Sequence, residues 1–285
     1  MTAISNRYEF VYLFDVRDGN PNGDPDGDNM PRLDVETGQG LVTDVCVKRK
    51  VRNYVEMVRG STAGYGIYVT EGAILNDKHA EAHNEVGSNP KGKGASIKIS
   101  EARLKMCERY YDVRTFGAMM ATDIDAGTAR GAVQLAFARS IDPITPQRHT
   151  ITRMAATKLN ENKDNKTMGA KWTVPYGLYR MHGYVSAPLA AKTGFSEDDL
   201  DLFWRALGNM MDHDRSATRG EMSAQRLIFF KHDSQFGNAP SHKLFSRLKV
   251  GRMSPDVIPR SFEDYEVTVD ASGLEEAGVE VIAKF

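Results

Sequence analysis

Basic side chains gather on one segment of the sequence that also has the period of a helix. Between Thr43 and Arg59 there are five Lys or Arg residues and two acidic residues, so the segment carries a net charge of +3. Lys48 and Arg52 stand one helical turn apart, beside an apolar stripe. Cations in such a row are spaced to follow a sugar-phosphate chain, although a solvated helix surface has the same composition. The segment indicates either a nucleic-acid-binding face or an ordinary exposed one.

A second basic segment lies at 142–171, where six Lys or Arg residues stand against three acids. The residues from His149 to Ala155 alternate as in a strand, and Met154 follows Arg153. We predict a protruding β-hairpin whose tip is the polar stretch 160–166. Such a hairpin could press an apolar side chain between bases while flanking cations such as Arg148 hold the backbone. A hairpin that only increases solubility would look much the same.

Other motifs in the sequence are incomplete. Asp18–Gly23 matches the first half of an EF-hand calcium loop, but the position that needs Glu is Asn29. Gly87–Gly94 resembles a phosphate-binding loop but ends in glycine where Ser or Thr should bind the metal. His79 and His83 have helical spacing without the zincin glutamate, which favours surface histidines. We therefore expect no metal site, no cofactor and no catalytic residue.

Composition limits the class of protein. The chain has 285 residues, with 37 Lys and Arg against 38 Asp and Glu, and so a net charge of −1. Any binding to nucleic acid must therefore come from a local basic patch. The apolar run Phe10–Phe14 is too short for a signal peptide or a membrane span. Cys46 and Cys107 match no metal spacing or disulfide framework, which favours a cytoplasmic globular protein.

The strongest secondary-structure signals occur in the order β-α-β-β-α-β. They are strands at 8–16, 131–139, 176–186 and 226–232, with helices at 43–59 and 196–211. This is the α+β order of ferredoxin-like folds and of RNA-recognition domains. A further edge strand is predicted at 262–269. The stretches 60–130 and 142–171 would then be insertions into a small core.

Several stretches together resemble a known family. They are Phe14-Asp15 running into Gly19–Pro25 and Pro31-Arg32, Thr43-Asp44 before Lys48–Arg52, Asp112–Gly117, Gly131–Gln134, Ser140–Pro143 and Pro175–Tyr179. In this combination the chain resembles the repeated backbone subunit of the CRISPR-associated Cascade complex, subtype I-C. The resemblance runs from about Tyr8 to about His232, and the NPNGDP loop followed by a K-x-x-x-R helix is its most specific part.

The resemblance implies an RNA-recognition-like palm with large insertions. We expect palm segments at 1–59, 131–141 and 172–285, a finger region at 60–130 and a thumb hairpin at 142–171. Such subunits are non-catalytic scaffolds that polymerise along a CRISPR guide RNA, and each thumb displaces a base at regular intervals. The implied partners are the guide RNA, a target DNA strand, adjacent copies of the chain, and the 5′-handle-binding, large and small subunits of Cascade. A membrane is not among them.

The resemblance also suggests which residues bind RNA. Lys48 and Arg52 match the helix that holds guide phosphates, with Arg49 beside them and Thr43 as a hydroxyl donor. Arg32 and Asn22 would face the same groove from the loop. On the thumb, Met154 is the expected wedge, and Arg148 and Arg153 flank it.

Two other functions stay open. In related type III backbone subunits an acidic loop residue cleaves target RNA, and the 15–28 loop, with Asp24 among its acids, could serve a metal-dependent ribonuclease. A ferredoxin-like protein-interaction module that binds no nucleic acid would have the same element order.

Overall fold

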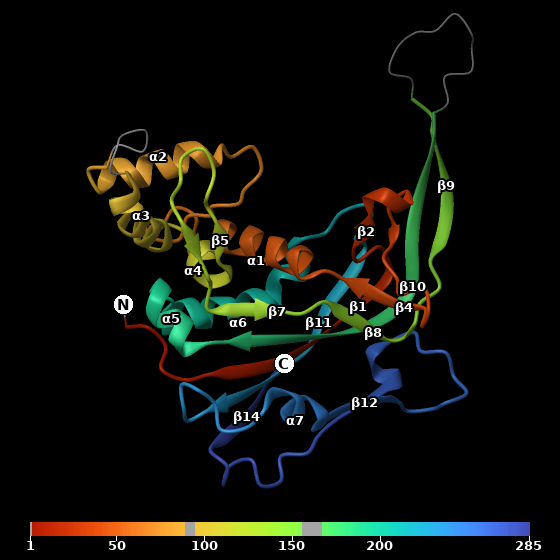
Figure 1. The fold of residues 1–285 in the computed structure, drawn as a ribbon. Helices are drawn as coiled ribbons and strands as arrows, with labels where there is room; N and C mark the ends of the chain where they lie inside the picture. The colour runs from red at the N-terminus through yellow and green to blue at the C-terminus, as the bar shows by residue number, and fades with distance from the viewer. Residues whose placement is uncertain (1, 89–94, 156–166) are drawn as a thin grey trace, which may run out of the picture.

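The computed structural model describes residues 2–88, 95–155 and 167–285 and centres on one antiparallel sheet (Figure 1). The sheet has eight strands in the order β14-β11-β1-β10-β8-β4, and β7 and β9 both pair with β10. Their bounds are β1 Tyr8–Gly19, β4 Gln39–Val42, β7 Val133–Leu135, β8 Ala138–Pro143, β9 Gln147–Arg153, β10 Thr167–Val185, β11 Glu221–His232 and β14 Val279–Lys284.

The central strand β1 is buried on both faces, which explains its nearly continuous apolar sequence. Phe10, Tyr12 and Phe14 pack into the core on one face. Val11 and Leu13 alternate with them and pack into a second core on the opposite face. Both faces of the sheet must therefore be covered by other elements.

Helices α1 (Asp44–Arg59), α5 (Ala187–Thr193) and α6 (Glu197–His213) belong to the first face. The predicted helices begin where their capping residues stand: Thr43 caps α1, and Ser196 forms a capping box with Asp199 at α6. In the described part of the chain, no helix combines the length and the apolar character that crossing a membrane requires.

The C-terminal segment covers the second face of the sheet (Figure 1). It contains α7 (Ser241–Ser246) and the separate two-stranded sheet of β12 (Leu248–Arg252) and β13 (Tyr265–Val269). Arg180 on β10 fixes this segment by donating to the backbone oxygens of Phe245 and Leu248. The strand predicted at 262–269 corresponds to β13, which begins at Tyr265 and pairs with β12.

The insertion between α1 and β7 has a core of its own, which includes Tyr68, Met106 and Met120. Its elements are α2 (Leu75–Glu85), α3 (Ala95–Arg109), α4 (Tyr111–Phe116), β5 (Ala118–Met119) and β6 (Thr128–Ala129). The prediction that His79 and His83 lie on the surface is wrong, since both are fully buried. The loop after β5 covers them, and they bond to the backbone oxygens of Ile124 and Asp125.

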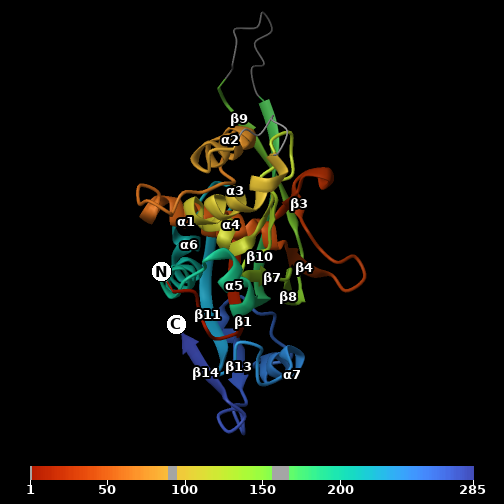
Figure 2. The same cartoon turned by 60° about the vertical axis from the view of Figure 1, so that its left-hand side comes forward.

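Two strand predictions need correction. The expected strand at 131–139 is divided into β7 and β8, and Phe137, which lies between them, is exposed. The expected strand at 176–186 extends back to Thr167, where β10 pairs with β9. This hairpin projects from the body of the molecule in both views (Figure 2). Residues 156–166, including the predicted polar tip and the predicted cations Lys158, Lys163 and Lys166, lie outside the described residues.

A buried ion pair joins the insertion to the sheet layer. Arg114 on α4 donates from Nε and Nη2 to the two carboxylate oxygens of Asp199 on α6, at 2.8 and 2.7 Å. Arg114 also donates to the backbone oxygen of Gly64. Both charged side chains are withdrawn from solvent, so each depends on the other for compensation.

The substitution Arg114→Ala is expected to lower the free energy of unfolding by about 3–5 kcal/mol, because it leaves the Asp199 carboxylate buried and unpaired. The matched control is Arg215→Ala, which removes an exposed pair with Asp212 and should cost about 0–1 kcal/mol. Urea denaturation of the two variants and the wild type measures both values. Equal losses would show that the buried pair has no special role.

Candidate nucleic-acid interface

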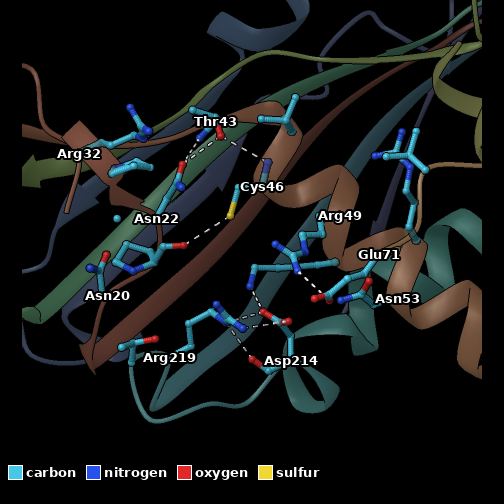
Figure 3. A pocket seen from close by; sticks show the side chains of 18 of the residues that line it. Asn20, Asn22, Arg32, Thr43, Cys46, Arg49, Asn53, Glu71, Asp214 and Arg219 are labelled. Carbon is cyan, nitrogen blue, oxygen red and sulfur yellow. Dashed lines mark hydrogen bonds and ion pairs between the residues drawn. The ribbon is translucent and has the colours of Figure 1, made fainter. Parts of the chain in front are cut away.

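An open groove of about 1230 Å³ lies beside the N-terminal half of α1 (Figure 3). One wall is the loop that follows β1, and the other is formed by residues 67 and 69–71 of the insertion. Asp214, Thr218 and Arg219 line it where the chain leaves α6. Of the predicted site residues, those that line the groove are Asn22, Arg32, Thr43, Arg49 and Arg52.

Hydrogen bonds hold the loop wall in one shape. The backbone N–H of Asn20 donates to Thr218, and its side-chain amide donates to the backbone oxygen of Asn29, each at 2.7 Å. Asn22 Oδ1 accepts from both the backbone N–H and the hydroxyl of Thr43, each at 3.0 Å. The hydroxyl of Thr43 therefore joins the loop to the start of α1.

The acidic part of the loop folds as a small ribbon of β2 (Gly23–Asp24) and β3 (Met30–Pro31) around a 3₁₀ turn at Pro25–Gly27. Gly23 is needed here because a Cβ atom would lie 2.9 Å from the backbone oxygen of Asn29. Asn29 itself has a positive φ of 59°. The loop thus folds back on itself as one short ribbon.

The cationic row predicted on α1 is not an open surface. Lys48 Nζ lies 2.8 Å from Asp44, and Arg52 Nε lies 2.7 Å from Asp112. Each of these cationic side chains is only 14% exposed. Both also lie over the ring of Phe116. Two residues expected to bind phosphate are thus held by carboxylates of the same chain.

The other cations near the groove differ in exposure. Lys50 is buried and pairs with Asp214, whose carboxylate also forms an ion pair with Arg219 at 2.8 Å. Arg49 is 73% exposed and only loosely paired, 4.0 Å from Glu71. Sequence reasoning missed Arg219, because nothing local in the sequence places it beside α1. Arg49 is therefore the most accessible cation of the three predicted on this helix.

The hairpin stands next to the groove's loop wall. Arg148 Nε on β9 lies 3.6 Å from a carboxylate oxygen of Asp28, and Arg32 pairs with Asp24 at 3.2 Å. The β2–β3 ribbon lies beside the base of the β9–β10 hairpin (Figure 1). The two predicted basic regions, α1 and the β9–β10 hairpin, thus lie on one side of the molecule. The loop between β2 and β3 contacts the hairpin through Asp28.

The hairpin exposes more apolar surface than was predicted. Met154 is 73% exposed, and Met168 on β10 is 71% exposed. Met168 pairs with Thr152, and paired residues share one face of a ribbon. Met154 stands two residues beyond Thr152 and directly follows the last residue of β9. Arg153 pairs across the ribbon with Thr167.

The acids proposed for a ribonuclease do not come together. Asp15 lies in the sheet and accepts from the hydroxyl of Tyr176 at 3.1 Å, and burial raises the pKa of its carboxyl group. Asp24 and Asp28 instead pair with arginines at the loop wall. Across residues 2–88, 95–155 and 167–285, no cluster of three His, Cys, Asp or Glu side chains suits a metal ion.

Comparison with known proteins gives consistent results. Residues 6–270 match the family described as CRISPR-associated protein Cas7. A Haloferax volcanii protein of that name is 26% identical over 298 residues, covering 97% of this chain and 83% of the relative. A chain of the solved "CRISPR RNA-guided surveillance complex, pre-nicking" has a similar fold, with a TM-score of 0.52 at 15% identity over 79% of this chain and 78% of that chain.

The substitution Asn22→Ala is expected to lower the free energy of unfolding by about 1–3 kcal/mol, because it removes the acceptor of two hydrogen bonds from Thr43. The control is Asn209→Ala, an exposed asparagine whose amide bonds within α6 and whose loss should cost under about 0.5 kcal/mol. Denaturant midpoints measure both. A neutral Asn22→Ala variant would mean that the loop is held at other points.

Proposed function

Because the chain belongs to the CRISPR-associated Cas7 family, we propose that it is a non-catalytic backbone subunit that holds a guide RNA in an RNA-guided surveillance complex. The observation that carries the proposal is the groove beside α1, which offers Arg49 and Arg219 and lies on the same side as the hairpin. An exposed arginine in an open groove, as Arg49 is here, suits a phosphate backbone of any sequence. The guide can therefore vary while the contacts stay the same.

The arrangement of the sheet supports the palm assignment. Strand β1 lies between β11 and β10, and β7 and β8 pair with β10 on its other edge, with α1 and α6 on one face. A ferredoxin-like palm has this neighbour order. Aromatic residues on an open sheet face bind RNA in many RNA-recognition domains. Here the C-terminal segment covers that face, so we place the RNA beside α1 instead.

The projecting hairpin suits the role of a thumb, and the insertion at 60–130 suits that of a finger. Met154 and Met168 together offer an unbranched, polarizable apolar surface that can lie against a base. Arg148 at the hairpin base supplies a cation for the backbone on either side of a displaced base. We propose that the two methionines act together as the wedge.

The finer assignments rest on the NPNGDP loop and the helix after it. We propose that the complex is of type I-C, that copies of this chain stand side by side along the guide, and that spaced guide segments pair with target DNA. The guide 5′-handle-binding, large and small subunits are the proposed neighbours. Lys48 and Arg52 then serve mainly to fix α1, while Arg49 and Arg32 contact phosphate.

The substitution Arg49→Glu should weaken binding of single-stranded RNA by about tenfold, or about 1.4 kcal/mol, and reduce the salt slope by about 1. The control is Lys249→Glu, which makes the same charge change at an exposed site on β12, in the C-terminal segment. Fluorescence anisotropy across a salt series measures both. If the two variants lose equal affinity, the groove assignment is wrong and only total charge matters.

The double substitution Met154→Ala and Met168→Ala should reduce base unstacking with little loss of affinity, because the cations that hold the backbone remain. RNA carrying 2-aminopurine at successive positions should brighten on wild-type binding and stay quenched with the variant. Met253→Ala, at an exposed methionine of the C-terminal segment, is the control. An unchanged signal in the double variant would contradict the wedge role.

A further inference from the structure

One buried acceptor in the groove has no donor. Asn20 lines the groove and is only 4% exposed. Its amide nitrogen donates to Asn29, but no donor in the described part of the chain reaches its Oδ1 atom. Burying an unpaired acceptor of this kind costs about 1–3 kcal/mol. An unpartnered acceptor in a residue that lines a groove needs an explanation, and a donor from a bound ligand is one.

A second unpartnered atom in the same groove has the opposite polarity. Arg32 lines the groove, and its Nε–H is buried and finds no acceptor among the described residues. Arg32 is tied to this wall by its backbone, since its N–H donates to the backbone oxygen of Asn22 at 3.2 Å. The same stretch of loop therefore holds one buried acceptor and one buried donor that have no partner among the described residues.

The chemistry of a nucleic-acid backbone narrows the choice of donor. Phosphate and ring oxygens only accept hydrogen bonds, whereas the ribose 2′-hydroxyl can also donate. Base amino groups could donate too, but they change with sequence, and a guide-binding groove must accept every sequence. The 2′-hydroxyl is the one backbone donor that each ribonucleotide carries and that DNA lacks.

We propose that Asn20 Oδ1 accepts a hydrogen bond from a ribose 2′-hydroxyl while Arg32 Nε donates to a phosphate oxygen of the same strand, so that the groove selects RNA over DNA. This inference rests on the proposed guide-RNA function and names its determinant of sugar specificity. The loop holds the acceptor in place because Asn20 is fixed at its backbone by Thr218 and at its side chain by Asn29.

The test uses the full chain, freed of nucleic acid, and three single-stranded oligonucleotides of one mixed sequence. They are RNA, DNA and RNA with 2′-fluoro sugars, which keep the RNA sugar pucker but cannot donate. RNA should bind about tenfold more tightly than both of the others. Equal affinity for RNA and 2′-fluoro RNA would overturn the proposal, even if DNA bound weakly, because the groove would then read the shape of the strand.

The substitution Asn20→Ala should lower RNA affinity to the 2′-fluoro level and leave 2′-fluoro affinity unchanged. Asn209→Ala is the matched control and should keep the full preference for RNA. If the substitution loosens the loop, the affinities of the wild-type chain for the three oligonucleotides still test the proposal. Failure of RNA itself to bind would overturn the proposed function as well, whereas tight binding of RNA and 2′-fluoro RNA alike overturns only this inference.

Discussion

The basic face of α1 can pack inside the molecule only because carboxylates from three places hold its cations. Asp44 is on α1 itself, Asp112 comes from the insertion, and Asp214 follows α6. A buried cation without such a partner would cost several kcal/mol, so these pairs decide how the three regions meet. The groove forms where the three regions meet. Its accessible positive charge comes chiefly from Arg49, because Lys48, Lys50 and Arg52 are paired with carboxylates.

The covered second face of the sheet has a functional consequence. The C-terminal segment buries Val11, Leu13 and their neighbours, so the sheet cannot serve as an open stacking platform. The binding surface proposed above is therefore the side of the molecule that carries α1, the β2–β3 ribbon and the projecting hairpin (Figure 1). Fold resemblance to RNA-recognition domains would by itself have suggested the sheet face that the C-terminal segment covers.

The acidic loop that carries Asp24 and Asp28 has contacts that indicate a structural role. Asp24 and Asp28 neutralise arginines at the loop wall and at the hairpin base, so the loop joins two basic regions that would otherwise repel each other. With Asp15 enclosed in the sheet, the run of acids that looks like one cluster in sequence belongs to two environments.

Local sequence determined the elements of this protein. The apolar run of β1, the caps at Thr43 and Ser196 and the alternation in β9 depend on neighbouring residues, so they could be predicted. Tertiary structure alone decided which cations stay exposed and which histidines are covered. Arg52 meets a carboxylate 60 positions away and Lys50 one 164 positions away, and the loop that buries His79 is likewise distant in sequence. Charge pairing and burial depend on distance in space, which no local pattern encodes.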